Sequence, residues 1–191
     1  MSDPVTQFAR VPRPYLGVDE KAPDGVLPGQ QMAELGSDEA VLFVVGMRIN
    51  RLRKVRSWWP AFVGMPKMLK ELEEHPEEGL LHARSYFSGR QLMVLQYWRS
   101  AEDLGRYAKN MALTHAPAWA AFNSSGAAGS GDVGLFHETY VVPREGIESR
   151  YANMPVTGLA AAFAALPRSQ RTQRTKADDR LGVVDPEYVA S

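Results

Sequence analysis

Four short apolar runs along the chain have the length and composition of β-strands. The run VLFVVGMRI at 41–49 is rich in β-branched residues. LLHARSYF at 80–87 and QLMVLQYW at 91–98 are separated by a short link that contains a glycine, which is typical of a hairpin. A fourth run, LFHETYVV at 135–142, stops at a proline that cannot donate a ladder hydrogen bond. We expect a strand at each of these places.

Two stretches between the runs have the spacing of amphipathic helices. From Ser57, a residue that can cap a helix, apolar residues recur three and four positions apart as far as Leu72. Pro66 interrupts this pattern, so the stretch forms either one kinked helix or two short ones. Ser100, followed three residues later by Asp103, indicates the start of a second helix. The predicted order of elements is βαββαβ.

This order predicts an α+β, ferredoxin-like domain over residues 41–166, with a four-stranded antiparallel sheet and both helices on one face. Residues 1–40 hold five of the thirteen prolines and no sustained period, which indicates an extended N-terminal arm. The segment GLAAAFAAL at 158–166 is expected to form a short apolar helix, and residues 167–191 a polar, loose tail.

The face of the sheet away from the helices needs a cover. The first and third runs are almost continuously apolar, and such strands are usually buried on both faces. The simplest cover is the sheet of a second subunit, which would give a homodimeric α+β barrel. The alternative is a monomer in which the N-terminal arm and the short apolar helix cover this face.

Composition limits the partners of the protein. In 191 residues, 22 basic and 22 acidic side chains cancel, so no net charge favours nucleic acid or an anionic membrane as a partner. The absence of cysteine excludes disulfides and thiol chemistry and fits a cytoplasmic protein. No apolar run is long enough to span a bilayer. Motifs for phosphoryl transfer, Rossmann hydride chemistry and serine hydrolysis are missing.

His115 is the leading candidate for chemistry. A helical turn capped by Thr114 would place His115, Trp119 and Phe122 on one apolar stripe, close to a helix N-terminus that disfavours imidazolium. A neutral imidazole in an apolar cavity could act as a general base, as a hydrogen-bond donor to a bound oxygen, or as an axial haem ligand. The alternative is a core histidine bonded to a backbone carbonyl. His137 could join the same site or be an ordinary strand residue.

Other residues could complete a pocket between the helices and the sheet. Trp98, Trp119 and Asn123 are expected to shape its cavity, although core packing would also explain the tryptophans. Arg48 and Asn50 stand at the end of the first strand beside further basic residues. This group could hold a carboxylate or haem propionates, or it could be a solvated loop.

Several runs in the same order resemble the fumagillin-pathway monooxygenase-like family, which was once a domain of unknown function. They include GMRINRLRKVRSWWPAF, VLQYWRSAEDLGRYA, THAPAWAAFN, GDVGLFHETY and YANMP, and they extend over about residues 41–166. The resemblance implies the dimeric α+β barrel fold of antibiotic-biosynthesis monooxygenases. In several relatives a histidine of the second helix faces the pocket, and His115 is the matching position.

The resulting expectation is a monooxygenase-like redox enzyme that acts on a hydrophobic small molecule, within secondary metabolism. Two cofactor states stay open, haem b and no cofactor. Two other functions also stay open because the fold alone does not define the reaction. One is a haem-dependent lyase or dehydratase, and the other is a non-catalytic ligand-binding dimer.

Overall fold

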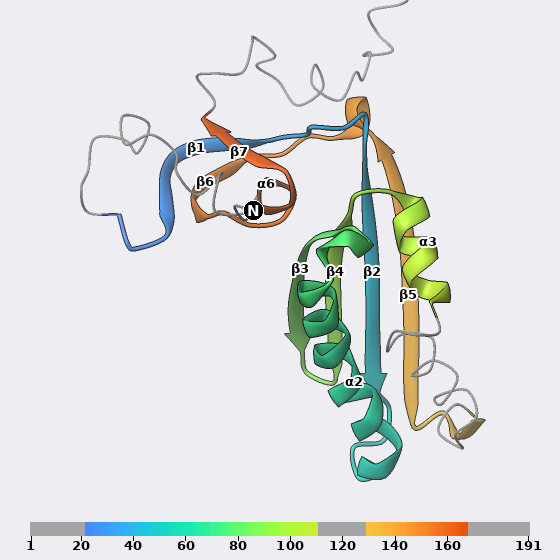
Figure 1. Cartoon of the computed structure of the whole chain (residues 1–191). Coiled ribbons are helices and arrows are strands. Elements are labelled where there is room, and N and C mark those ends of the chain that lie inside the picture. Colours follow the sequence, from blue (N-terminus) through green and yellow to red (C-terminus); the bar gives the residue numbers. More distant parts are fainter. Residues whose placement is uncertain (1–21, 111–128, 168–191) are drawn as a thin grey trace, which may run out of the picture. The chain divides into compact units, whose positions relative to one another are not determined.

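The computed structural model describes residues 22–110 and 129–167 (Figure 1). By their contacts, these residues divide into two compact units. One unit is the continuous segment 41–141, and the other combines residues before 41 with residues after 141. The predicted division into an arm at 1–40, a domain at 41–166 and a tail at 167–191 stays a prediction.

The larger unit has the predicted βαββαβ order. Its elements are β2 (Glu39–Ile49), α2 (Val55–Glu74), the short 3-10 helix η2 (Pro76–Glu78), β3 (Leu80–Ser88), β4 (Gln91–Trp98), α3 (Ala101–Lys109) and β5 (Val133–Pro143). The four strands form one sheet in the order β3-β4-β2-β5. β4 pairs antiparallel with both neighbours, and β5 runs opposite to β2 in Figure 1. The predicted ferredoxin-like α+β fold is confirmed.

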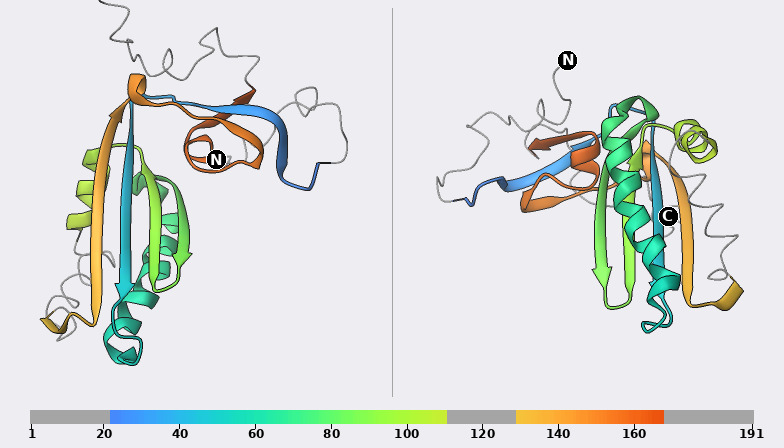
Figure 2. Two further views of the ribbon diagram at one scale, coloured as in Figure 1. Left: turned by 180° about the vertical axis from the view of Figure 1, so that it is seen from behind. Right: turned by 60° about the horizontal axis from the view of Figure 1, so that its bottom comes forward.

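Both helices cover the same face of this sheet, because in the view from behind the strands lie in front of α2 and α3 (Figure 2). The register of β2 and β4 defines which side chains face the helices. Val41 is paired with Trp98 at one end of the sheet, and Arg48 is paired with Gln91 near the other. Since side chains alternate along a strand, Val41, Phe43 and Val45 share one face while Leu42 and Val44 share the other.

Two apolar clusters fill the space between the helices and the sheet. The first cluster joins the start of β2 and the end of β4 to both helices through Val41, Leu72, Trp98, Leu104 and Tyr107. The second cluster lies under the first half of α2 and contains Met47, Met65, Leu92, Val94 and Val133. Burial of the large apolar side chains of both clusters is the main source of stability for this layer.

The first helix differs in detail from its prediction. α2 is a single helix of 20 residues that contains both Pro60 and Pro66, so it is not divided in two. It begins after Lys54, which makes no side-chain cap, and Ser57 lies inside its first turn. The Ser57 hydroxyl donates instead to Asp132 Oδ2 at 2.9 Å. Ser100, in contrast, caps α3 as expected, accepting from the Asp103 amide at 3.0 Å.

The smaller unit contains elements that the sequence did not predict. β1 (Val26–Glu34) lies between β6 (Tyr151–Pro155) and β7 (Ala164–Pro167) in an antiparallel sheet. The helix expected at 158–166 is only α6 (Leu159–Ala162), and the chain then becomes β7. Buried Leu27, Ala33, Ala160 and Ala165 form the core of this unit. A short 3-10 helix, η3 (Arg144–Gly146), also belongs to it.

Gly46 allows an unusually close contact across the sheet face away from the helices. A Cβ atom at this position would lie 2.6 Å from Phe136 Cε1 and 2.7 Å from the Leu92 carbonyl oxygen. The carbonyl belongs to the strand backbone and cannot move away easily. The aromatic ring of β5 is therefore seated directly over the backbone of β2.

We predict that Gly46→Ala lowers the free energy of unfolding by about 1–3 kcal/mol through overpacking. The matched control is Gly64→Ala, because Gly64 lies within α2 and an added Cβ meets no atom within 4 Å. The control should raise stability by about 0.5–1 kcal/mol, the helix preference of alanine over glycine. Denaturant titration followed by tryptophan fluorescence measures both. Equal effects of the two substitutions would contradict the contact at Gly46.

Candidate active site on the helix-covered face of the sheet

A row of side chains crosses the middle of the sheet on the helix-covered face. Gln96 of β4 pairs with Ala83 of β3 on one side and with Phe43 of β2 on the other. His137 of β5 extends the row, because its ring centroid lies 5.7 Å from that of Phe43. We call these four residues the central row. It is the level at which polar groups interrupt the apolar interior.

The central row lies between the two apolar clusters. On one side is the pair Val41–Trp98 of the first cluster, and on the other is the pair Val45–Val94 of the second. The Gln96 residue is 6% exposed, and its Oε1 accepts a hydrogen bond from Trp98 Nε1 at 2.9 Å. Its amide nitrogen has no hydrogen-bond partner among the described residues. A primary amide in such a place can donate to an oxygen atom of a bound molecule.

A phenol borders the row on the side of the first cluster. The Tyr107 ring lies 5.6 Å from the Trp98 ring, and its hydroxyl donates to Glu71 Oε2 at 3.4 Å. Burial, together with the Glu71 carboxylate, raises the pKa of Tyr107 well above its ordinary value. Tyr107 therefore stays protonated at neutral pH, so it acts as a hydrogen-bond donor and not as a base.

The described histidines have three different environments. His137 is exposed and belongs to the central row. His82 is paired with Tyr97 and stacks on it at 6.3 Å on the face without helices, where burial lowers its pKa and its Nε2 has no partner. His75 is outside the sheet, and the hydrogen bond to Glu77 raises its pKa. Among the described residues, His137 is thus the histidine on the helix-covered face.

The predicted site residues fall into three groups. His115, Trp119 and Asn123 lie outside the described residues. Trp98 is 1% exposed and contacts Gln96 beside the central row. Arg48 and Asn50 are exposed near the opposite end of β2, at a distance from Trp98 of about 23 Å for seven residues of strand. The structure therefore brings Trp98 together with the central row but not with Arg48 and Asn50.

Asn50 belongs to a polar corner that joins β2 to β5. Its side-chain amide donates to the Gly131 carbonyl at 3.0 Å. Nearby, the buried Asp132 carboxylate accepts from Arg51 and Ser57, each at 2.9 Å. The hydrogen bond from Ser57 is the main cause that lowers the pKa of Asp132. These contacts connect the end of one strand to the start of another, and a role for Arg48 and Asn50 in holding haem propionates stays a prediction.

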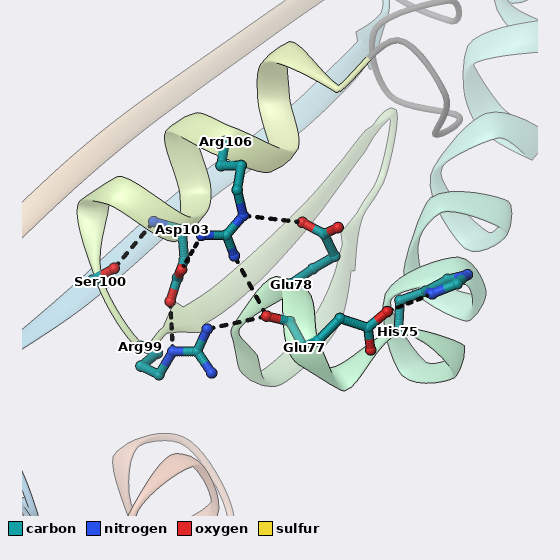
Figure 3. A network of polar contacts seen from close by, with 7 residues as sticks. All are labelled: His75, Glu77, Glu78, Arg99, Ser100, Asp103 and Arg106. Carbon is teal, nitrogen blue, oxygen red and sulfur yellow. Dashed lines mark hydrogen bonds and ion pairs between the residues drawn. The ribbon is translucent and has the colours of Figure 1, made fainter.

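A charged network fixes the start of α3 (Figure 3). The Asp103 carboxylate accepts from Arg99 Nε at 2.6 Å and pairs with Arg106 at 2.7 Å. Arg99 also donates to the Glu77 carbonyl of η2 at 3.0 Å. Gly79 packs so closely on the carboxylate that a Cβ would lie 2.6 Å from Asp103 Oδ2, and its φ of +96° favours glycine as well. The network holds the start of α3 against η2.

Gln96 is the residue that sequence reasoning missed. Within QLMVLQYW it is in phase with Leu92, Val94 and Trp98, all of which are buried on the helix-covered face. A polar residue in the buried phase of a strand is uncommon and needs a partner. That interruption is the signal from which the central row could have been found. Among the described residues no group of three or more His, Asp or Glu side chains could hold a metal ion.

The fold and this layer of polar groups define a class, the ferredoxin-like α+β proteins with a candidate site between helices and sheet. The family model described as monooxygenase af470-like matches residues 40–159. The chain therefore belongs to this family, which confirms the resemblance seen in the sequence. A search of curated proteins found no match.

Solved structures are similar to this chain at low identity, and the first of the following shows the same fold. An aldoxime dehydratase crystallised with butyraldoxime is 16% identical, with a TM-score of 0.56, and the match covers 87% of this chain and 47% of that one. The cofactor-independent oxygenase SnoaB from Streptomyces nogalater is 13% identical, with a TM-score of 0.38 and coverage of 55% and 92%. A possible oxidoreductase from Bacteroides thetaiotaomicron is 17% identical, with a TM-score of 0.38 and coverage of 55% and 99%.

The network at α3 predicts a pH dependence of stability. The hydrogen bond from Arg99 lowers the pKa of Asp103, so the folded chain binds this proton more weakly than the unfolded chain. The stabilisation is complete above the ordinary aspartate pKa of about 3.9 and is lost as the pH falls through the lower folded value. We expect the free energy of unfolding to fall more steeply with acidification in the wild type than in Asp103→Asn. Denaturant titrations across this pH range measure the difference, and Glu102→Gln, which removes a neighbouring exposed carboxylate, should keep the wild-type slope.

Proposed function

We propose that the protein is a monooxygenase-like redox enzyme that acts on a hydrophobic small molecule bound between the helices and the sheet. The match to the monooxygenase family over residues 40–159 is the observation that carries this proposal. The central row supports it, because a polar level between two apolar clusters suits a molecule that is mostly apolar and has one or two oxygen atoms. We place the reaction in secondary metabolism. We place the protein in the cytoplasm, and the absence of cysteine agrees with that compartment.

The proposed chemistry starts with removal of a proton from the substrate. His115 is the base in this proposal, and Trp119 and Asn123 line the cavity with Trp98. The amide nitrogen of Gln96 would donate to the oxygen that becomes negatively charged, since oriented donors in a dry site stabilise such anions. Tyr107 is kept protonated by its surroundings and would leave this task to the histidine. The electron-rich anion can then react with molecular oxygen.

Two cofactor states, haem b and none, are part of the proposal. A haem would bring an iron centre for redox or dehydration chemistry and needs an axial ligand in a closed pocket. Among the described residues, His137 is on the correct face but is exposed. The described residues alone thus do not make a haem site, and no step above is routed through haem. A haem in this protein would depend on His115.

We also propose a homodimer that forms through the sheet face without helices. This face presents partly exposed apolar side chains from the two central strands, among them Leu42, Met93 and Leu95. Two such sheets placed face to face would bury these side chains, as packed sheets do. Sedimentation velocity at micromolar concentration should give twice the monomer mass, and a monomer at all concentrations would contradict this part of the proposal.

An oxygen electrode provides the first test of activity. Anthrone is a suitable probe, because it is flat and apolar and its anion reacts with one molecule of oxygen to give anthraquinone and one molecule of water. The purified protein should accelerate oxygen uptake with anthrone without an added reductant, and His115→Ala should abolish the acceleration. Anaerobic conversion of butyraldoxime to its nitrile would favour the dehydratase function instead. No turnover, together with tight binding of the probe, would favour a non-catalytic binding protein.

Variants at Gln96 separate a catalytic role from a structural one. Gln96→Leu removes the amide but leaves the buried indole N–H of Trp98 without its acceptor, which should cost about 1–3 kcal/mol of stability. The double variant Gln96→Leu/Trp98→Phe removes both polar groups and should recover most of this loss. If Gln96 orients the substrate, the double variant should be stable but should still turn the substrate over slowly. Activity that recovers together with stability would show that Gln96 has only a structural role.

Absorption spectroscopy distinguishes the two cofactor states. Protein purified from haem-supplied cells should show a Soret band if haem is bound, and His115→Ala should remove or shift it. The matched control is His137→Ala, since His137 is the described histidine of the central row. A colourless protein that fails to take up haem in titration would leave the cofactor-free state. Loss of the Soret band in His137→Ala alone would show that His137 of β5, and not His115, is the axial haem ligand.

A further inference from the structure

Basic side chains are concentrated in one part of the chain although the whole chain is neutral. Residues 40–70 contain seven lysines and arginines and no aspartate or glutamate. Four of these basic residues, Arg51, Arg53, Lys54 and Arg56, lie in the loop after β2 and the first turn of α2. From the net charge of zero we expected no attraction to anionic surfaces. This one segment is nevertheless strongly positive.

The same segment exposes large apolar side chains. Leu52, Val55 and Trp59 are 49%, 48% and 51% exposed, and they make up three of the eight large hydrophobic residues exposed in the described part of the chain. Val55 and Trp59 are four residues apart in α2 and so lie on one side of the helix start, and Leu52 lies in the turn that precedes it. Exposed apolar residues scattered singly need no explanation, but a group of three with basic neighbours does. We call residues 51–62 the basic tip.

The basic tip is a preformed structure. The indole N–H of Trp58 donates to the Leu52 carbonyl at 3.1 Å and so holds the loop against the helix. The Trp59 ring stacks on Phe62 at 5.8 Å, and Trp58 meets Phe62 edge to face at 6.0 Å. Figures 1 and 2 show that the first turns of α2 extend beyond the adjacent ends of the strands. The exposed apolar side chains therefore lie on a projecting end of the unit.

The charges at the tip are mostly not neutralised within the protein. Arg51 pairs with Asp132 at 2.9 Å. Among the described residues, no carboxylate pairs with Arg53, Lys54 or Arg56. These three side chains are exposed and border the apolar group on both sides of Val55. They are available to an external anion.

We propose that the basic tip binds reversibly to the surface of membranes that contain anionic phospholipids. Tryptophan favours the boundary between headgroups and acyl chains, and leucine and valine can enter it, while lysine and arginine bind the anionic headgroups. A nucleic acid would use the positive charges and the aromatic ring but gives no reason for exposed Leu52 and Val55. A projecting end also suits a surface that can be penetrated. The inference does not depend on the enzymatic activity proposed above.

Vesicle sedimentation tests this inference with the full chain. The protein should sediment with vesicles of phosphatidylcholine and phosphatidylserine, much less with phosphatidylcholine alone, and less as salt is added. Replacing Arg53, Lys54 and Arg56 by serine should weaken partitioning about a hundredfold at low salt, given about fivefold for each charge near an anionic surface. The double variant Leu52→Ser/Trp59→Ser should weaken it about tenfold.

The matched control is Val141→Ser, because Val141 is 49% exposed and lies near the far end of β5. It should bind vesicles as the wild type does. Unfolding curves confirm that each variant is folded. The proposal would be overturned if the wild-type protein bound vesicles with and without phosphatidylserine equally, or if the tip and control variants lost vesicle binding to the same extent. Binding to polyglutamate but not to vesicles would also overturn it and would indicate an acidic protein partner.

Discussion

The position of the second helix in the larger unit depends on the carboxylate of Asp103. It is nearly buried, so its charge needs compensation, and two arginines provide it. Because Arg99 also reaches η2, the start of the second helix is tied to the turn that precedes β3. The network thus fixes α3 to η2 within the larger unit.

The interior beneath the helices is divided into two apolar clusters with a polar level between them. Such a division costs stability, because burial of an amide in a core is unfavourable unless the amide is hydrogen-bonded. The indole of Trp98 donates to the side-chain oxygen of Gln96, and no described residue accepts a hydrogen bond from the amide nitrogen. An uninterrupted apolar layer would be more stable but could not orient a ligand. Polar groups that weaken a core in one defined place are typical of binding sites.

The sequence was sufficient for the parts of the fold that depend on local pattern. The four strands and two helices of the larger unit could be predicted because each apolar period is complete within its own segment. Pro66 did not divide α2, since burial of Met65 and Leu72 on either side outweighs one missing hydrogen bond. β1 could not be predicted in the same way. Its partners lie more than a hundred residues away, and Gly29 with a φ of +80° interrupts its alternation.

The candidate site was predictable only in part, for related reasons. The burial of Trp98 can be predicted from the alternation of buried residues in its own strand. The separation of Trp98 from Arg48 cannot, because it depends on how β2 pairs with β4, two strands that are far apart in the sequence. Ser57 was predicted to cap the helix because serine is a common capping residue. Its hydroxyl donates instead to the buried carboxylate of Asp132, just before β5. Residues that act across the sheet are thus the ones for which local reasoning was insufficient.

The close packing of Phe136 on Gly46 limits which residues position 46 can hold. A ring that rests on a bare backbone takes the space of the side chain that glycine lacks. A side chain at position 46 would also meet the backbone carbonyl oxygen of Leu92, so a smaller residue at position 136 would not by itself make room for it. Glycine at position 46 is therefore required by the backbone of β4 as well as by the ring of Phe136.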